Sequence, residues 1–359
     1  MKIAIIGAGL AGLSCALTLE KHGHSADIFE KQRSVGFDLT IAELITPILH
    51  SPIDDFIKFL SESHGIHLKP TSNIQRIHVH SPNETAYVEG NLGFINMRGN
   101  HKEAYEKQLA EQLTASPIHN QHVTPKEISK DYTHVVVATG EPLDTQQFQP
   151  FHIEFKSTFA GAVVNGNFIR NEVHAWFDTE LAPKGMLYLL PHSDSEATLV
   201  LVYPQYDDQS VQDKKKLWKE SVKRVSQTLG QELSTKEDLS IRDYVVGKCD
   251  YPRIGNIFFA GNCMGAIKPF LGFGQTGSIL SGIYAAQDLC GLGDYDKLCK
   301  PLFKDYQNSL RYRKTIEKLS NDQLDLVTKS LRVNAVERVF TGENWGLLKV
   351  LSHLLRPFS

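Results

Sequence analysis

Short, mainly apolar runs recur along the chain, and turns rich in small residues follow several of them. Such runs are typical of parallel strands that are covered on both faces. The run at residues 3–6 is followed by a helical pattern from residue 10, as in a strand–turn–helix unit. The parallel strands predicted in this way are residues 3–6, 26–30, 135–138 and 258–260.

A different pattern fills the middle of the chain. From Ile74 the apolar positions recur with period two, and residues 150–207 alternate apolar and polar positions with many Phe and Tyr, which predicts a β-rich lobe. Helical spacing predicts helices at 40–64 (broken by Pro47 and Pro52), 101–113, 209–230, 275–289 and 300–359. The fold class predicted is therefore α/β, with a Rossmann-like domain, an interleaved β-rich lobe and a helical C-terminal tail.

Composition narrows the class of protein only slightly. The chain has 359 residues, 41% hydrophobic and 22% charged, which suits two globular domains or two interleaved lobes. A net charge of −3 implies no nucleic acid partner, and no apolar run approaches the roughly 20 residues that span a bilayer. Five cysteines without C-x-x-C or zinc spacing favour buried thiols in a reducing, cytoplasmic compartment. No obligate protein partner is inferred.

The strongest chemical signal is the glycine pattern after the first strand. Gly7, Gly9 and Gly12 have the G-x-G-x-x-G spacing between a strand and a helix. Gly7 allows a tight turn, Gly9 lets a pyrophosphate approach the backbone, and Gly12 lets the helix pack closely on the sheet. The helix N-terminus attracts phosphates, and Glu30 ends the second strand where it can accept hydrogen bonds from a ribose diol.

Two later strands also end in glycine. The strand at 135–138 runs into Thr139-Gly140, and the strand at 258–260 runs into Gly261-Asn262. In this order the three signatures are those of FAD enzymes, in which the flavin lies extended across one discontinuous domain. Residues 269–274 are predicted to wrap the isoalloxazine. The helix that begins near Gln275 would then point its positive dipole end at the flavin N1–C2=O edge.

These signatures divide the chain into three parts. The FAD-binding domain is predicted to comprise residues 1–70, 98–154 and 246–300, and the substrate domain residues 71–97 and 155–245. Residues 301–359 form the helical C-terminal region. No second G-x-G-x-x-G is present, so NADPH or another reductant is expected to visit transiently as the electron donor.

At this level the sequence resembles the geranylgeranyl reductase family, within the flavoproteins folded like p-hydroxybenzoate hydroxylase. Residues 181–191 are similar to the family's A-P-x-G-Y-x-W-x-F-P strand, which lines the substrate cavity, and residues 261–274 to its G-D-A-A-G…P…G-x-G segment. Lys31, in a polar turn that runs past the nucleotide, and Gln275 are further predicted cofactor contacts. The residues that the resemblance implies for FAD contact are Gly7, Gly9, Gly12, Glu30, Arg33, Arg98, Gly140, Gly261, Asn262, Pro269, Gly272 and Gly274.

The chain departs from the family's pattern at several positions. Asn262 stands where the family has Asp, and Met186, Tyr188 and Leu190 replace residues of the cavity motif. Tyr188 and Leu190 are predicted to contact the substrate. No catalytic acid is identified, although Tyr188 is a candidate. Glu141 follows Thr139-Gly140 where aromatic hydroxylases of this class carry an Asp-Gly pair.

Three functions are compatible with these residues. The first is an FAD-dependent oxidoreductase that reduces C=C bonds of a small apolar, prenyl-like substrate by hydride transfer from flavin N5, in a long dry cavity. The alternative is an FAD-dependent monooxygenase of the same fold, which the missing Asp-Gly pair disfavours. The third is a non-catalytic, FAD-holding scaffold or electron-transfer partner.

A possible metal site is rejected on the sequence alone. His78 and His80 share one face of a predicted strand. With no third ligand in view, they are predicted to be solvated surface histidines, and no metal is expected.

The C-terminal segment carries an apolar stripe. One interpretation is that this stripe packs on the protein's own surface. The alternative is that it lies in a membrane interface as a peripheral contact. The residues of the stripe are Leu347, Leu348, Leu351, Leu354, Leu355 and Phe358, one face of a helix.

Overall fold

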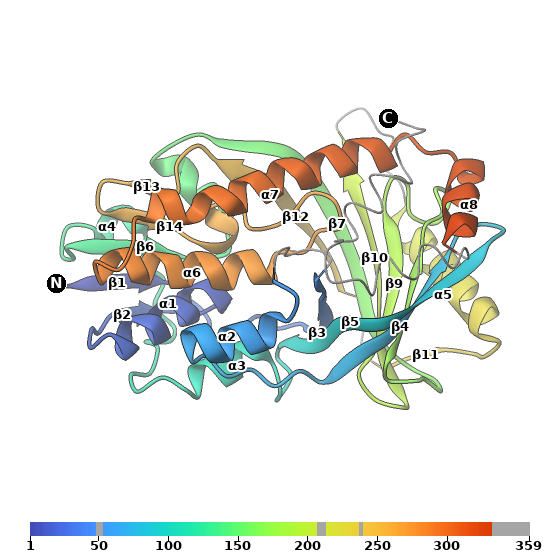
Figure 1. The fold of residues 1–359 in the computed structure, drawn as a ribbon, viewed down its shortest axis with the longest axis horizontal. Coiled ribbons are helices and arrows are strands. Elements are labelled where there is room, and N and C mark those ends of the chain that lie inside the picture. Colours follow the sequence, from blue (N-terminus) through green and yellow to red (C-terminus); the bar gives the residue numbers. More distant parts are fainter. Residues whose placement is uncertain (48–52, 207–212, 237–239, 332–359) are drawn as a thin grey trace.

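The computed structural model describes residues 1–47, 53–206, 213–236 and 240–331. Two sheets lie next to each other along the long axis of the molecule, and helix α7 (Tyr295–Ile316) runs along both (Figure 1). The predicted C-terminal stripe at 347–358 lies outside the described residues.

The first sheet, sheet A, is the Rossmann-like part. Its strands follow the order β13-β14-β6-β1-β2, and β14, β6, β1 and β2 are parallel neighbours. Every residue of β1 and β14 is buried, which explains their wholly apolar sequences. The strands are β1 (Ile3–Ile6), β2 (Asp27–Phe29), β6 (His134–Val137), β13 (Arg253–Ile254) and β14 (Ile257–Phe259).

Helices α1 (Leu10–Lys21) and α6 (Gln275–Leu289) cross in close contact beside sheet A. A Cβ atom added at Gly282 would lie 2.0 Å from the carbonyl oxygen of Ala11, so only glycine permits this crossing. The contact packs the N-terminal unit against a segment more than 250 residues later in the chain. Both helices carry apolar residues on nearly every side, as expected for helices that are buried between other elements. The remaining elements of this lobe are α2 (Phe56–His64), α3 (Tyr105–Ala110), α4 (Pro125–Ile128) and the 3₁₀ helices η2 (Pro142–Gln147) and η3 (Gly261–Cys263).

The second sheet, sheet B, follows the order β11-β7-β10-β9-β8-β4-β5-β3, and β12 pairs with β7. Its pairs are antiparallel except β4–β8, which is parallel. The strands are β3 (Thr40–Ile45), β4 (Ser72–His80), β5 (Thr85–Gly99), β7 (Phe151–Asn165), β8 (Glu172–Trp176), β9 (Met186–Pro191), β10 (Glu196–Gln205), β11 (Ser234–Thr235) and β12 (Ser240–Cys249).

Sheet B packs on both faces. Helix α5 (Lys214–Leu229) covers one face, where Trp176, Leu187, Leu189 and Val225 form a common core. The opposite face holds a smaller core that includes Ile95 and Leu190. On β9, Leu187 and Leu189 point to one face, and Tyr188 and Leu190 point to the other. The apolar residues of this strand therefore pack in both cores.

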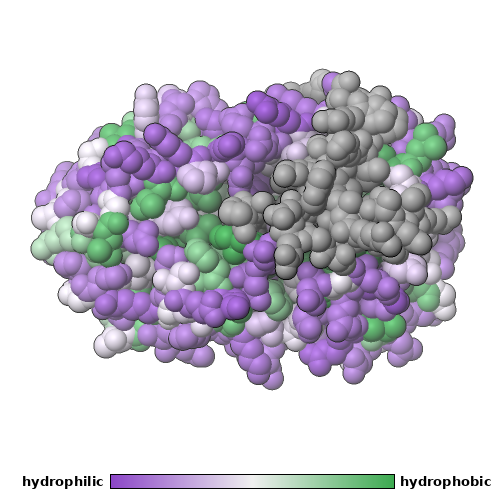
Figure 2. All heavy atoms as spheres, in the orientation of Figure 1, coloured by the Kyte–Doolittle hydropathy of each residue, from purple (hydrophilic) through white to green (hydrophobic). Residues whose placement is uncertain are grey.

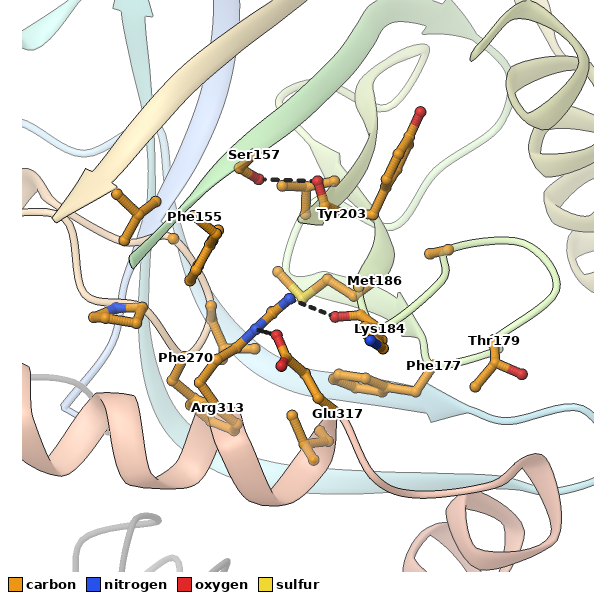
Figure 3. A pocket seen from close by; sticks show the side chains of 18 of the residues that line it. Phe155, Ser157, Phe177, Thr179, Lys184, Met186, Tyr203, Phe270, Arg313 and Glu317 are labelled. Carbon is orange, nitrogen blue, oxygen red and sulfur yellow. Dashed lines mark hydrogen bonds and ion pairs between the residues drawn. The ribbon is translucent and has the colours of Figure 1, made fainter. Parts of the chain in front are cut away.

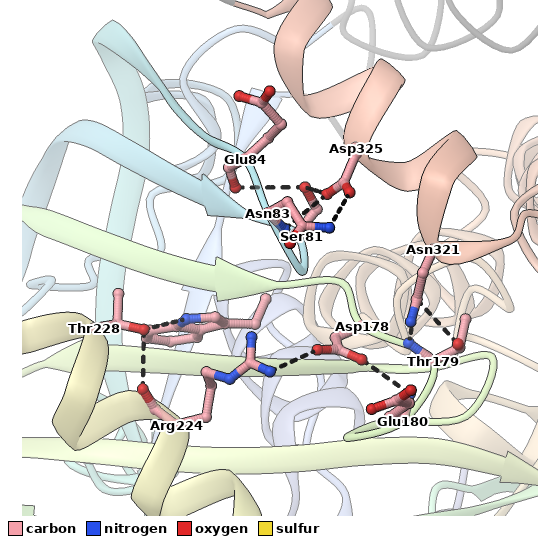
Figure 4. A network of polar contacts seen from close by, with 11 residues as sticks. Ser81, Asn83, Glu84, Asp178, Thr179, Glu180, Arg224, Thr228, Asn321 and Asp325 are labelled. Atoms are coloured by element: carbon pink, nitrogen blue, oxygen red, sulfur yellow. Dashed lines mark hydrogen bonds and ion pairs between the residues drawn. The ribbon is translucent and has the colours of Figure 1, made fainter.

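Helix α8 (Asn321–Ser330) is held by side-chain hydrogen bonds (Figure 4). Asp325 accepts hydrogen bonds from the Ser81 hydroxyl, at 2.6 Å, and from the Asn83 amide group, at 2.8 Å, in the β4–β5 turn. Asn321 accepts from the backbone N–H of Thr179 at 2.9 Å. Helix α8 is thereby fixed against the rim of sheet B.

The predicted elements are largely confirmed, with one correction. Residues 40–64 were expected to be helical, but residues 40–45 form β3, which pairs antiparallel with β5. Within this stretch, the helical spacing of apolar residues corresponds to a helix only at α2. At residues 40–45, pairing with a distant strand outweighs the local pattern. The long strands β5, β7 and β12 continue across the boundaries predicted between the two lobes, and the domain division itself stays a prediction.

The visible surface in Figure 2 is mostly hydrophilic, with small hydrophobic groups between. Exposed large apolar side chains such as Tyr87, Ile169 and Tyr251 lie far apart in sequence. Among the described helices, none combines the length and hydrophobicity needed to cross a bilayer. All five cysteines are free, and four are buried, as the sequence predicted.

Candidate functional site

The turn between β1 and α1 has the geometry of a phosphate-binding loop. Gly7 has a φ of +104°, and a Cβ atom there would lie 2.4 Å from the carbonyl oxygen of Ala138. A Cβ atom at Gly12 would lie 1.9 Å from the carbonyl oxygen of Gly7. Side chains are therefore excluded at both positions by the close packing of turn, helix and strand β6.

Gly9 has a different role from its two neighbours. A Cβ atom built on it meets no protein atom within 4 Å, and it caps α1 without a side-chain hydrogen bond to the helix. The first N–H groups of α1 thus face a position where a ligand can approach the backbone. This turn fits a pyrophosphate.

Glu30 lies at the end of β2, beside this turn. It is 7% exposed, and its carboxylate accepts hydrogen bonds from the backbone N–H groups of Ala8 and Gln32, each at 2.8 Å. These bonds fix the carboxylate, and its remaining lone pairs can accept further donors. The position fits a ribose diol next to the phosphate turn.

A pocket of about 460 Å³ extends from the turn. Gly7, Glu30 and Lys31 line one part of it, and residues 121–125 line another. Lys31 and Arg33 are exposed. The pocket includes Lys31 among its lining residues but not Arg33, so of these two predicted contacts only Lys31 borders it.

The second and third signatures meet at the ends of β6 and β14. The side-chain amide of Asn262 donates to the carbonyl oxygen of Gly140 at 3.3 Å, which joins the two turns. A Cβ atom at Gly140 would also meet no protein atom within 4 Å. The backbone N–H of Gly261 donates to the Ser281 hydroxyl on α6, at 2.9 Å. Parallel strands bring these turns to the same sheet edge as the phosphate loop.

Arg98, at the end of β5, is held by two carboxylates. Its guanidinium donates to Glu106 and Glu43, each at 2.8 Å, and lies over the ring of Phe37. Burial lowers the pKa of Arg98, but Glu106 and Glu43 outweigh it and the net pKa is raised. Glu43 was not recognised from the sequence. It belongs to β3, which the sequence pattern assigned to a helix.

The segment before α6 approaches sheet B. The Gln275 and Asn96 side chains exchange amide hydrogen bonds, at 2.9 and 3.3 Å, and both are buried. A Cβ atom at Gly272 would lie 2.8 Å from the hydroxyl of Tyr244, and one at Gly274 would lie 3.1 Å from Ile267. Asn96 and Tyr244 were missed because their partners are distant in sequence. Only buried polar residues within apolar strands could have indicated them.

A second cavity, of about 620 Å³, opens beside this segment (Figure 3). Pro269–Gly272 forms one wall, sheet B another, and α7 and α8 the third. Phe155, Phe177, Met186 and Phe270 give the cavity a mainly apolar lining.

One ion pair lies in this cavity. The Arg313 guanidinium on α7 pairs with Glu317 one turn later and donates to the carbonyl oxygen of Lys184 at 2.6 Å. It also lies 5.1 Å from the ring centre of Phe155. Glu317 accepts a further hydrogen bond from the Tyr206 hydroxyl at 2.5 Å. Both charges are thus neutralised within the protein.

Tyr188 and Leu190 do not line this cavity. Leu190 is fully buried in the core opposite α5, and Tyr188 packs against that core. Burial, and then the nearby Glu43, raises the pKa of Tyr188 well above its ordinary value. Their predicted contact with substrate stays a prediction, and Met186, two residues earlier on the same face, is the member of this strand that borders the cavity.

The phosphate turn, the acidic end of β2 and the two glycine turns of β6 and β14 define a dinucleotide-binding fold of the flavoprotein type. A sequence family described as an NAD(P)-binding Rossmann-like domain matches residues 5–69. No curated protein sequence gives a significant match.

Solved structures with the same fold cover nearly the whole chain. A geranylgeranyl bacteriochlorophyll reductase-like protein from Thermoplasma acidophilum is 14% identical, with a TM-score of 0.70 and 98% of each chain covered. A flavin-dependent brominase is 15% identical, with a TM-score of 0.61 over 99% of this chain and 98% of its own. A 2-methyl-3-hydroxypyridine-5-carboxylic acid oxygenase is 15% identical, with a TM-score of 0.58 over 99% of this chain and 96% of its own. The fold is therefore geranylgeranyl reductase-like, as the resemblance in sequence implied.

Proposed function

We propose that the protein is an FAD-dependent oxidoreductase that reduces C=C bonds of an apolar, prenyl-like substrate. The observation that carries the proposal is the apolar cavity of about 620 Å³ beside residues 269–272, the segment expected to wrap the flavin ring. A concave site with a mainly apolar lining and a few polar groups suits a small molecule.

The residues of the nucleotide turn fit FAD. Gly9 lets the pyrophosphate reach the N-terminus of α1, and Glu30 accepts from the adenosine ribose. Gly140 and Asn262, whose turns are joined by a hydrogen bond, would hold the part of the cofactor beyond the pyrophosphate. Bound there, FAD would supply the hydride-transfer chemistry that amino acid side chains do not provide.

The cavity favours an uncharged substrate. An isolated alkene offers no hydrogen-bonding group, so its binding depends on displacing water from apolar surface. Arg313 and Glu317 neutralise each other, and the Lys184 ammonium, which also lines the cavity, lies 4.9 Å from the ring centre of Tyr206. The aromatic and aliphatic lining stabilises an alkyl chain by about 25 cal/mol per Å² of buried surface.

Tyr188 can hold a proton near the junction of the two lobes. A phenol of ordinary pKa is already protonated at neutral pH, and burial and then Glu43 raise the pKa of Tyr188 further. Although Tyr188 borders the core of sheet B and not the cavity in this structure, we retain its phenol as the candidate donor to a developing carbanion. The electron donor is proposed to be NADPH or another transient reductant.

A monooxygenase is the second candidate. Among the proteins of the same fold are a brominase described as flavin-dependent and an oxygenase, which supports this alternative at the level of fold. Glu141 in place of the Asp-Gly pair weighs against it. The two functions differ in their need for oxygen.

The test begins with the absorption spectrum and the released cofactor of the purified protein. FAD rather than FMN is expected. Anaerobic NADPH titration should then bleach the flavin, and a prenyl alkene, but not its saturated analogue, should restore the oxidised spectrum without oxygen. Turnover that requires oxygen would identify the monooxygenase. A protein that cannot be reconstituted with FAD would contradict both.

The cavity can be tested separately with a matched pair of variants. Ile316→Trp fills space in the cavity lining, whereas Leu326→Trp makes the same change on α8 at a side chain that is 59% exposed. Ile316→Trp is expected to raise KM by about tenfold, equivalent to about 1.4 kcal/mol, with flavin content unchanged. Equal KM values for both variants would place the substrate elsewhere.

A further inference from the structure

Strands β4 and β8 bring together side chains that are far apart in sequence. Their parallel register sets His174 opposite His78, and Glu172 opposite Arg76. The three side chains of His78, His174 and Glu172 are partly buried, and their potential ligand atoms lie within 4.8 Å of one another. The sequence-based prediction of solvated histidines considered only β4. His80 is in fact 5% exposed, so that prediction is wrong for it.

The contacts already join these groups in pairs. His78 Nε2 lies 2.8 Å from Glu172 Oε2, and the His78 and His174 rings stack with centroids 4.4 Å apart. The other carboxylate oxygen, Glu172 Oε1, accepts from Arg76 at 2.8 Å. Arg76 therefore orients the carboxylate and leaves Oε2 turned toward the histidines.

We propose that His78, His174 and Glu172 bind a divalent transition-metal ion of the Zn²⁺ type. Two imidazole nitrogens and one carboxylate oxygen are a ligand set that zinc accepts, with water in the fourth position. The side chains of His78 and Glu172 are 18% and 15% exposed, which gives the ion and the water a route from solvent.

Binding needs only small side-chain movements. Bonds of about 2.0–2.2 Å to a tetrahedral ion set ligand atoms about 3.4 Å apart, against the present limit of 4.8 Å. Because the two imidazole planes are nearly parallel, at 7°, each ring must turn about its Cβ–Cγ bond to aim a nitrogen at one ion. The strand backbones can stay in place.

The surroundings support the ligands. His80 Nε2 lies 3.1 Å from His174 Nδ1, and His80 Nδ1 lies 3.1 Å from the Thr85 hydroxyl. These hydrogen bonds engage Nδ1 of His174 and leave its Nε2 for the ion. Hydrogen bonds to the second imidazole nitrogen support the ligands of zinc sites in the same way.

The ion would stabilise the fold and would take no part in the redox chemistry. His174 shares its face of sheet B with Leu187 and Leu189, whereas Tyr188 lies on the opposite face. The β4–β8 pair joins residues 40–99 to residues 151–205 within sheet B. A metal bridge there would add a further cross-link to the backbone pairing of β4 with β8.

The test uses the full-length, tag-free protein after removal of metal with a chelator. Zn²⁺ titration by calorimetry is expected to give one ion per chain, with a rise in melting temperature because the ion binds the folded state. His78→Gln and Glu172→Gln should each weaken binding by about tenfold or more. His152→Gln is the matched control, since His152 pairs with Asp250 at 2.7 Å outside the cluster.

A second measurement distinguishes loss of the metal ligand from a general loss of stability in the variants. Co²⁺ in place of Zn²⁺ should give visible d–d absorption in the native protein and in His152→Gln, but not in folded His78→Gln. Wild-type protein that neither binds Zn²⁺ at one per chain nor gains thermal stability would overturn the proposal. Equal Zn²⁺ affinity in His78→Gln and His152→Gln would also overturn it.

Discussion

At the scale of single residues, Glu30 is the side chain on which the proposed nucleotide binding would depend most directly. Its carboxylate is already fixed by two backbone N–H donors beside Gly9. A fixed acceptor loses little conformational entropy when a ribose binds, which makes each hydrogen bond more effective.

Glu30→Ala is therefore expected to lower the FAD content of the purified protein. Glu20→Ala is the control, because Glu20 also accepts from two backbone N–H groups, of Thr114 and Ala115, but at the far end of α1. Flavin absorbance per protein measures the difference. The same FAD content in both variants would show that Glu30 does not contact the cofactor.

Tyr188 offers a second test at this scale. Tyr188→Phe removes the proton and keeps the ring, so turnover should fall by about tenfold or more while FAD content stays constant. Tyr87→Phe, on β5 and 47% exposed, should change neither. Loss of flavin in Tyr188→Phe would indicate that the hydroxyl supports the cofactor site and not the reaction.

At the scale of secondary-structure elements, the crossing of α1 and α6 holds two distant signatures together. Gly282 permits it, because its Cα hydrogen faces the Ala11 carbonyl where any side chain would collide. This close approach helps to place the phosphate loop at the start of α1 relative to the segment that begins α6.

Gly282→Ala should destabilise the protein by about 1–3 kcal/mol, the usual cost of overpacking. Gln287→Ala on the same helix, at a half-buried position, is the control. Urea denaturation measures both free energies of unfolding. A stabilised Gly282→Ala, as helix propensity alone predicts, would mean that the helices can separate without cost.

The stacked histidines of β4 and β8 make stability depend on pH. Burial, and then His78, lowers the pKa of His80 to about 4 from an ordinary 6.5. The unfolded chain binds this proton below about pH 6.5 and the folded chain only near pH 4. Stability should therefore fall as the pH drops through this range, by about 3 kcal/mol for this group.

Urea denaturation between pH 7.5 and pH 4.5 checks this expectation. His80 faces Thr85, His174 and Trp176, so His80→Gln keeps a polar group in place. The variant should show a weaker decline in stability on acidification. An identical slope in both proteins would assign the pH dependence to other groups.

At the scale of the whole molecule, two sheets share one chain that passes between them repeatedly. Helix α7 lies along both, and its Arg313 reaches the cavity at the rim of sheet B. The candidate cofactor site and the cavity lie at different sheets, and residues 269–272, which are expected to wrap the flavin ring, line the cavity.

The C-terminal stripe belongs to this scale as well, although it lies outside the described residues. A protein truncated at Thr341 should keep its flavin and lose co-sedimentation with anionic liposomes, if the stripe contacts a membrane. A melting temperature lowered by many degrees on truncation, or full-length protein that never binds liposomes, would instead make the stripe part of the fold.

The sequence by itself determined the parts of the protein whose structure is local. The strand, turn and helix from Ile3 to Lys21 follow from apolar spacing and three glycines, because their contacts connect residues within a few positions. The start of α6 at Gln275 and the β-rich lobe were also predicted correctly. These features need no knowledge of distant partners.

Only the tertiary structure decided the rest. Residues 40–45 became a strand because β5, with partners between 49 and 59 residues later, supplies their hydrogen bonds. The pairing of Asn96 with Gln275 and the stack of His78 on His174 likewise join residues far apart in the chain. No local pattern encodes such pairs, since each residue alone is compatible with an ordinary surface or core position.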